Sequence, residues 1–382
     1  MCRASLAAIA VAAALAFPAA ASSDDSAGLA AQPPRLEAAA WYLVGGDGAV
    51  LAERNARRPR AIASITKLMT AVVVLERARL TDTVRVGARA ARIGESTAFL
   101  RAGEELSVAD LLRGMLVRSA NDAAEALALH VGHGSLARFV ALMNAKAREL
   151  GLADTAFRNP HGLDAPGHVS SARDATLLLR YALGIPFLRD TLARPSVTLP
   201  GGRELPSTDD LLSSWPPLLA GKTGHTQEAG WSQAAAARAR GMTVYGTVLG
   251  SGSREERNAA LRTLLAWGLD RYRRIAAIDA ARVYAEAQTG YGRPPVALVA
   301  RRQAVRTVRE GVPLVERVVA PAAVALPVRR GQRLGTVDVY AQGRLLASAD
   351  LVAAATVTEP GLAAKARWYV RETLENLWKV VT

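Results

Sequence analysis

The spacing of hydrophobic residues changes several times along the chain and outlines the first predicted elements. Two short apolar runs, 41–44 and 49–51, flank a Gly-Gly-Asp-Gly turn, a pattern that predicts a β-hairpin. From Ser64 to Glu76 apolar residues recur mostly at helical spacing, which predicts a largely buried helix that begins at Ser64. Residues 107–150 are helical in pattern and rich in alanine, with a predicted junction between two helices at 119–121.

The middle of the chain adds a long loop and a sheet. Residues 159–171 are rich in Gly, Pro and His, which predicts an ordered loop before a helix at 174–183. The runs 230–238 and 242–249, with the short apolar run before them, predict antiparallel strands, and a long helix follows at 255–272. We therefore expect an α/β (α+β) domain over residues 22–275, in which helices cover an antiparallel sheet.

The pattern of the last hundred residues differs. Residues 280–358 consist of short valine-rich runs separated by Gly, Pro and Arg, which predicts a small β-rich domain. A predicted helix at 362–382 carries its apolar residues on one arc: Val370, Leu374, Leu377, Trp378 and Val381. This amphipathic pattern favours a helix that lies on a membrane surface, and the alternative is a helix packed against the β-rich domain.

The first 21 residues have the pattern of a secretory signal peptide. Arg3 precedes an apolar run at 6–17 and a small-residue cleavage site at 19–21, so the mature chain is expected to begin near Ser22. Removal of this segment takes away Cys2, the only cysteine, which excludes a cysteine nucleophile or a cysteine metal site. No later segment offers the roughly 18 apolar residues that a spanning helix needs. We expect an exported, periplasmic protein.

The formal net charge of +14 comes mainly from arginine. Export and the lack of a basic run interleaved with stacking aromatics argue against nucleic acid as a partner. Anionic envelope polymers or lipids fit the charge better, and an ordinary solvated surface is the commonest explanation for it.

Three separate segments carry a known catalytic signature. They are Ser64-Ile65-Thr66-Lys67, Ser119-Ala120-Asn121 and Lys222-Thr223-Gly224. Ser-x-x-Lys, Ser-x-Asn and Lys-Thr-Gly in this order are the signature of penicillin-binding proteins and serine β-lactamases. Each residue alone has an ordinary structural explanation, such as a helix cap or a surface charge, but the set makes coincidence implausible.

The chemistry of these residues follows from their types. A serine hydroxyl needs a base within hydrogen-bond reach, and Lys67 lies one helical turn after Ser64. A lysine acts as that base when burial and a nearby cation, here Lys222, lower its pKa. Ser119 would relay a proton to the leaving amine, and Asn121 would orient Lys67 and the substrate.

The third segment also offers groups for substrate binding. The developing oxyanion needs two backbone N–H donors, and those of Ser64 and His225 are the expected pair. Lys222 and Thr223 present an ammonium and a hydroxyl to a free carboxylate, and Gly224 leaves room for a substrate strand. The four other histidines, at 130, 133, 161 and 168, lack ligand spacing and are assigned to the surface or to loop structure, so no metal or cofactor is expected.

The chain resembles the low-molecular-mass penicillin-binding proteins that act as D-alanyl-D-alanine carboxypeptidases. The resemblance rests on the three motifs, on the segments 157–164 and 170–174, and on the order of catalytic domain, β-rich domain and amphipathic helix. It implies a β-lactamase/transpeptidase-like fold and removal of the terminal D-alanine from peptidoglycan stem pentapeptides, with a role in cell-wall maturation and cell shape. It also implies acylation by β-lactams and peripheral attachment to the outer face of the inner membrane.

The chain departs from the family pattern in three places. Ile62 stands where a proline is usual, Ser207-Thr208-Asp209-Asp210 stands where asparagines are usual, and residues 234–237 are all alanine. None removes a catalytic group, but each bears on substrate preference. Arg257, with Arg254 as the weaker choice, is the candidate second cation for the substrate carboxylate.

Other functions fit parts of this pattern. A class A β-lactamase needs a deacylating glutamate between the second and third motifs, and no Glu-x-x-Leu-Asn occurs there. A DD-endopeptidase uses the same site and stays open as an alternative. A non-catalytic peptidoglycan-binding scaffold would not need two lysines in the motifs. Only five of 48 basic residues are lysines, and two of them lie there; arginine could not replace Lys67 as a base because it does not lose its proton.

Overall fold

The computed structural model describes residues 32–381 and divides them into two compact units. The division lies between Arg271 and Tyr272, close to the predicted boundary at 275. We call residues 32–271 the N-terminal unit and residues 272–381 the C-terminal unit. The predicted signal peptide lies outside the described residues.

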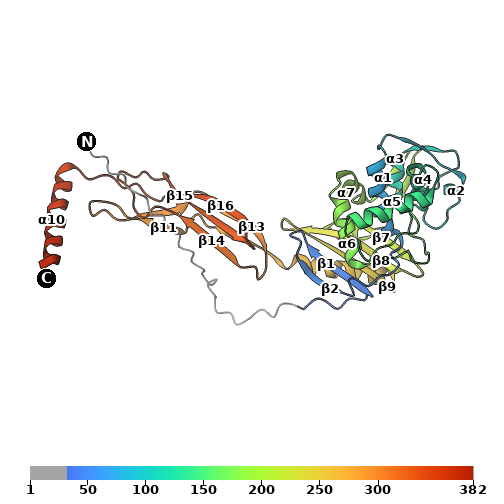
Figure 1. Ribbon diagram of the computed structural model, residues 1–382, viewed down its shortest axis with the longest axis horizontal. Coiled ribbons are helices and arrows are strands. Elements are labelled where there is room, and N and C mark those ends of the chain that lie inside the picture. The colour runs from blue at the N-terminus through green and yellow to red at the C-terminus, as the bar shows by residue number, and fades with distance from the viewer. Residues whose placement is uncertain (1–31, 382) are drawn as a thin grey trace. The chain divides into compact units, whose positions relative to one another are not determined.

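The N-terminal unit is built on one antiparallel sheet of five strands in the order β2-β1-β9-β8-β7 (Figure 1). The strands are β1 (Ala40–Gly45), β2 (Val50–Arg54), β7 (Leu218–Thr226), β8 (Gly230–Ala239) and β9 (Met242–Ser251). The predicted hairpin and the three predicted later strands are confirmed. Because β7 is an edge strand, one side of the Lys-Thr-Gly segment is open to a ligand.

Helices pack on both faces of this sheet. α6 (Ala172–Leu183) and α9 (Arg254–Leu269) each contact β1, β8 and β9. Tyr42 and Val44 belong to the core shared with α6, whereas Leu43 lies against Gly268 of α9. Since successive residues of a strand point to opposite faces, the two helices cover opposite faces of the sheet.

The other helices of the N-terminal unit that Figure 1 labels lie on the α6 side. α1 is central among them: it contacts α3, α4, α5 and α6, and residues 67–74 are buried. The helices are α1 (Lys67–Arg77), α2 (Ala88–Ala91), α3 (Val108–Val117), α4 (Asn121–Val131), α5 (Leu136–Glu149), α7 (Pro186–Leu192) and α8 (Leu211–Ser214). Two small hairpins complete the unit: β3 (Thr83–Arg85) with β4 (Glu105–Ser107), and β5 (Ser196–Leu199) with β6 (Arg203–Pro206).

The C-terminal unit is mainly β, and its strands enclose an aliphatic core. A five-stranded sheet has the order β11-β12-β16-β15-β14, and β10 pairs with β13. The strands are β10 (Tyr272–Ile278), β11 (Val283–Ala287), β12 (Val296–Ala300), β13 (Ala304–Arg309), β14 (Leu314–Val319), β15 (Arg333–Ala341) and β16 (Arg344–Ala353). The pattern analysis missed β10, because it continued the preceding helix to 272 although that helix ends at Leu269.

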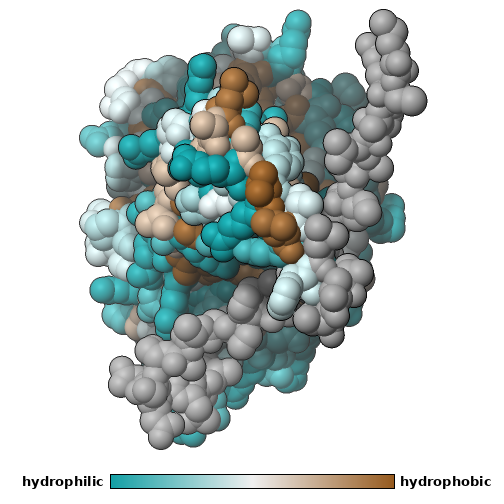
Figure 2. Space-filling model, turned by 90° about the vertical axis from the view of Figure 1, so that its left-hand side faces the viewer, coloured by the Kyte–Doolittle hydropathy of each residue, from teal (hydrophilic) through white to brown (hydrophobic). Residues whose placement is uncertain are grey.

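The chain ends with α10 (Leu362–Val381). Tyr291 holds the start of this helix through ring contacts with Trp368 and Tyr369. On the side of the molecule that carries α10, hydrophobic residues lie among hydrophilic ones (Figure 2). Within residues 32–381 no single helix is long and apolar enough to cross a membrane; α4 and α5, bent by 91°, pass that test only as a pair.

Candidate active site

Ser64 lies in a 3₁₀ turn, Ala63–Thr66, that leads directly into α1. The sequence predicted one helix from Ser64, and the structure corrects this: the α-helix begins at Lys67. The difference matters because side chains three residues apart eclipse each other in a 3₁₀ turn. Lys67 Nζ therefore lies 2.7 Å from Ser64 Oγ.

Three oxygen atoms surround the amine of Lys67, which is fully buried. Besides Ser64 Oγ, they are Asn121 Oδ1 and the carbonyl oxygen of His161, each at 2.7 Å. Asn121 Nδ2 donates to the carbonyl of Gly94, which fixes the amide with its oxygen toward the lysine. A neutral amine has two N–H groups for the two pure acceptors and one lone pair for a hydroxyl proton. An ammonium has three N–H groups and would donate to all three oxygens, so the partner set fits both protonation states, and the lowered pKa is what favours the neutral one.

The electrostatics of the site favour the neutral form of Lys67. Burial, and next the positive charge of Lys222, lower the pKa of Lys67 well below its ordinary value. Burial also lowers the pKa of Lys222, to about 7, although the carboxylate of Asp209 opposes the shift. Burial thus lowers the pKa of both lysines of the site.

Ser119 lies between α3 and α4, where the sequence predicted a helix junction. Its backbone has φ 66°, in the left-handed region, and this conformation turns the chain between the two helices. Lys222 Nζ donates to Ser119 Oγ and to the carbonyl of Thr223, each at 2.9 Å. All three motifs thus meet around one pair of lysines.

The loop at 159–168 closes over the buried lysine, a role that the pattern analysis did not find. His161 supplies its carbonyl to Lys67, and Gly162 (φ 93°) lies so close to the 3₁₀ turn that a Cβ there would be 1.9 Å from the carbonyl oxygen of Ala63. His161 and His168 are buried rather than on the surface. Burial and the proximity of Lys67 lower the pKa of His161 to about 3, so its ring is neutral. The only sequence signal for this role was the resemblance of 157–164 to the family.

Gly224 has a packing role besides the predicted open space for substrate. A Cβ at this position would lie 2.8 Å from the carbonyl oxygen of Ile62 and 3.2 Å from the nitrogen of Ser64. Glycine therefore lets β7 approach the turn that carries the nucleophile. His225 next to it is exposed and stacks on Trp231 with ring centroids 4.0 Å apart.

A cavity of about 490 Å³ connects these groups to solvent. Its wall includes Ser64, Ser119, Asn121, Thr223, Gly224, His225, Trp231, Arg254 and Arg257. The guanidinium of Arg257 lies in the wall with 2 % of the side chain exposed. Within residues 32–381 no group of three or more His, Cys, Asp or Glu side chains could hold a metal ion.

Comparison with known proteins identifies the family to which this active-site arrangement belongs. A family profile described as D-alanyl-D-alanine carboxypeptidase matches residues 27–253. The chain belongs to this family. The carboxypeptidase is 34 % identical over 354 residues to D-alanyl-D-alanine carboxypeptidase DacC of Escherichia coli K12, a match that covers 86 % of each chain.

Solved structures extend the comparison. Penicillin-binding protein 5 from Haemophilus influenzae superposes with a TM-score of 0.63 at 30 % identity, covering 86 % of this carboxypeptidase and 99 % of the other chain. A mutant of the Streptomyces K15 DD-transpeptidase gives a TM-score of 0.59 at 30 % identity and covers 62 % and 99 %. The predicted family, fold and activity are confirmed: the protein is a serine-type D-Ala-D-Ala carboxypeptidase that processes cell-wall peptidoglycan. Family membership implies peptidoglycan peptides as substrates and binding of β-lactams.

Proposed function

We propose that Ser64 is the nucleophile and Lys67 the general base of this carboxypeptidase. The carrying observation is the 2.7 Å contact between Ser64 Oγ and Nζ of Lys67, a fully buried lysine whose pKa is lowered well below its ordinary value. Ser64 Oγ attacks the carbonyl carbon of the penultimate D-alanine while its proton passes to Lys67. The backbone N–H groups of Ser64 and His225 hold the oxyanion.

Collapse of the tetrahedral intermediate needs a proton on the leaving amine. In our proposal Lys67 returns its proton by way of Ser119, the C–N bond breaks, and free D-alanine leaves an ester on Ser64. Water then attacks this ester and gives a proton to Lys67, which passes it to Ser64 Oγ as the ester C–O bond breaks and the shortened stem peptide leaves. Lys222 keeps Ser119 oriented by its 2.9 Å hydrogen bond and favours a neutral Lys67 by its charge.

Thr223 and Arg257 are the proposed partners of the substrate's terminal carboxylate. Thr223 and Arg257 line the same cavity as Ser64, and the buried guanidinium has little freedom to turn away. A fixed cation at one end of the cavity selects a peptide that ends in a free carboxylate, because an amide or a continuing chain leaves the cation without its counter-ion.

We also infer that α10 lies on the outer face of the inner membrane and attaches an exported, periplasmic enzyme there. Val370 and Leu374 of the predicted apolar arc are each 62 % exposed, so these two side chains are not packed against the β-rich domain. Exposed apolar residues on one helix face, next to charged ones, support surface attachment.

Two measurements on the purified protein test the proposed catalytic site: labelling with a fluorescent penicillin and release of D-alanine from a pentapeptide. Wild type should label and release D-alanine, and Ser64→Ala should do neither while keeping its unfolding temperature. A folded wild type that does not label would contradict the proposed site. Faster turnover of a chromogenic cephalosporin than of the pentapeptide would instead favour a β-lactamase.

A further inference from the structure

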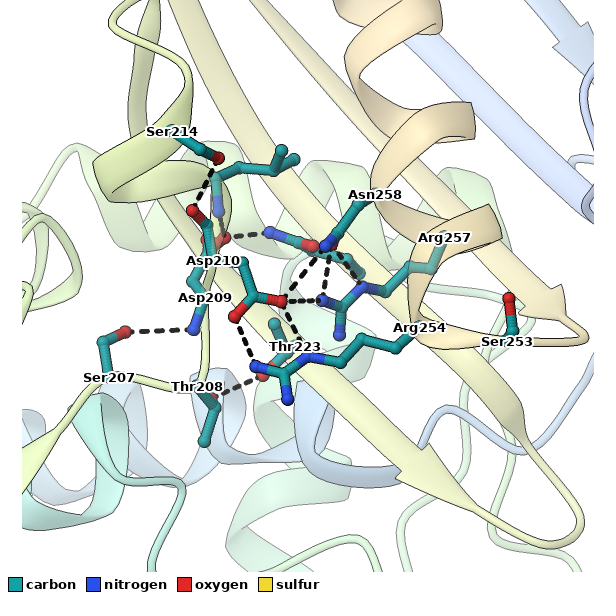
Figure 3. A network of polar contacts seen from close by, with 12 residues as sticks. Ser207, Thr208, Asp209, Asp210, Ser214, Thr223, Ser253, Arg254, Arg257 and Asn258 are labelled. Atoms are coloured by element: carbon teal, nitrogen blue, oxygen red, sulfur yellow. Dashed lines mark hydrogen bonds and ion pairs between the residues drawn. The ribbon is translucent and has the colours of Figure 1, made fainter.

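The segment Ser207–Asp210, which departs from the family pattern, joins β6 to α8 and lies beside the start of α9. In Figure 3 the carboxylate of Asp210 lies between the guanidinium groups of Arg254 and Arg257. Arg254 donates to it in a bidentate pair, from Nε to Oδ2 at 2.6 Å and from Nη2 to Oδ1. Asn258 Nδ2 adds a third hydrogen bond to Oδ2 at 3.1 Å. Asp210 thus organises the first turn of α9 at the cavity.

The segment that carries Asp210 is itself held firmly. Thr208 Oγ1 and Thr223 Oγ1 are 2.6 Å apart, which ties the segment to the Lys-Thr-Gly strand. The buried carboxylate of Asp209 accepts from Gln233 Nε2 at 2.7 Å and from the backbone N–H of Leu211 at 3.1 Å. A Cβ on residue 221 would lie 2.7 Å from Asp209 Oδ2, so Gly221 makes the space for this anchor.

The two arginines differ in their freedom. The side chain of Arg257 is 2 % exposed, whereas those of Arg254 and Asp210 are 45 % and 37 % exposed. An exposed arginine is mobile unless something fixes it, and a bidentate pair with a carboxylate fixes both its position and its plane. Although partial burial opposes the shift, the hydrogen bonds from Arg254 and Asn258 lower the pKa of Asp210, so the carboxylate is charged at neutral pH.

The pair leaves donors of Arg254 for a ligand. Its bonds to Asp210 use Nε and one hydrogen of Nη2, and Nη1 has no acceptor among the residues that the structure describes. Arg254 lines the same cavity as Ser64, Thr223 and Arg257.

We propose that Arg254 is a second arginine that binds the substrate's terminal carboxylate, and that Asp210 is the positioning residue that aims it. The proposal rests on the proposed function and specifies its carboxylate subsite. A terminal carboxylate would bind at Arg254 Nη1 while Nε and Nη2 stay on Asp210. The unusual aspartate in this segment then fixes the otherwise mobile guanidinium of Arg254. An asparagine would bind that guanidinium more weakly, because its side chain carries no charge.

Steady-state kinetics with two peptides test this directly: an N-acylated peptide ending in D-Ala-D-Ala and its C-terminal carboxamide. Loss of one charge-assisted contact costs about 10- to 100-fold in binding, so Arg254→Gln should raise KM for the free acid by about that factor. Its kcat should change little, and both constants for the carboxamide should stay within about twofold. Equal losses on both peptides would overturn the role of Arg254.

A double-mutant cycle separates positioning from direct contact. Asp210→Asn should raise KM for the free acid in wild type and raise it clearly less in the Arg254→Gln background, where the 3.5 Å ion pair of Asp210 with Arg257 remains. Equal costs in both backgrounds would overturn the positioning role. Should Arg254→Gln not fold, Arg254→Lys serves instead, since it keeps the charge but not the fork and is expected to give a smaller KM increase.

The chain provides a matched control in the C-terminal unit. Arg282 and Glu316 form a bidentate pair at 2.9 and 3.1 Å with a similarly exposed arginine, and neither residue lines the cavity. Arg282→Gln should leave KM for both peptides unchanged. A wild type that neither labels with penicillin nor releases D-alanine would contradict the proposed function, whereas an active wild type with an unaffected Arg254→Gln variant would contradict this inference alone.

Discussion

The N-terminal unit buries the charged residues Lys67, Glu125, Lys222 and Arg257, whereas between residues 273 and 381 no described charged or hydrogen-bonding side chain is buried. Burying a charge costs free energy unless partners compensate or the group becomes neutral. A unit that carries chemistry tolerates this cost because burial without a carboxylate partner lowers the pKa of a lysine and lets it act as a base. The aliphatic core of the C-terminal unit has no such conflict, so its buried residues serve folding alone.

Two buried lysines within the N-terminal unit also differ, in the direction in which their pKa is shifted. Lys146 is nearly as buried as Lys67, but Glu76 and Glu149 lie 2.6 and 2.7 Å from its Nζ. Although burial lowers it, the hydrogen bonds to these carboxylates raise the pKa of Lys146 above its ordinary value. Lys67 has neutral oxygen partners instead, and its pKa falls. Burial makes a lysine a base only where no hydrogen-bonded carboxylate offsets the lowering of its pKa.

The largest expected effect comes from Ser64→Ala. Removing the nucleophile should lower kcat/KM for D-alanine release by on the order of 10⁴-fold or more, while the unfolding temperature stays within a few degrees. The readouts are D-alanine release and thermal unfolding. Residual penicillin labelling at another serine would break the assignment.

The second-largest effect is expected from Lys67→Arg. This variant should lose about 10³-fold in the rate of penicillin acylation, because arginine keeps its proton and cannot act as a base. The matched control is Lys146→Arg, which keeps the charge that Glu76 and Glu149 bind. The control should acylate at the wild-type rate. Similar losses in both variants would mean that structure, and not proton transfer, explains the effect.

The pH profile of kcat/KM should be bell-shaped. Activity rises with pH as Lys67 loses its proton, and it falls as Lys222 loses the charge that orients Ser119, with a midpoint at about 7 for the alkaline limb. In Lys222→Arg the side chain stays protonated, so the alkaline limb should move to higher pH or disappear. An unchanged alkaline limb in this variant would assign that limb to another group.

Leu351→Ala should affect the other unit and spare the chemistry. Leu351 is fully buried in the core of the C-terminal unit. Its truncation should cost about 2–5 kcal/mol of that unit's unfolding free energy, measured by denaturant unfolding. Penicillin acylation should change by less than about twofold. A large loss of acylation would show that the two units are energetically coupled.

The smallest expected effect on catalysis comes from deleting residues 362–382. The truncated protein should leave the membrane fraction, because the exposed apolar face of α10 is gone, and should keep its kcat/KM in solution. Fractionation and D-alanine release measure the two results. A truncated protein that stays with the membrane would assign attachment to another surface.

Periodicity and motif order determined much of this enzyme. The three motifs, the hairpin, the helix pair around Ser119, the later strands and α10 all follow from local patterns, since each depends on residues close in sequence. The motif set also identified the family and the chemistry. Its assignments to individual residues stay predictions for the experiments above.

Only the tertiary structure decided what surrounds each group. The carbonyl of His161 that completes the partners of Lys67 comes from 94 residues away, and a backbone oxygen has no signature in the sequence. The same holds for the ion pair between Asp210 and Arg254, 44 residues apart, for the carboxylates that raise the pKa of Lys146, and for the burial that lowers the pKa of Lys67. Sequence patterns report local geometry and residue type, but a pKa or a fixed guanidinium depends on neighbours that only the folded chain brings together.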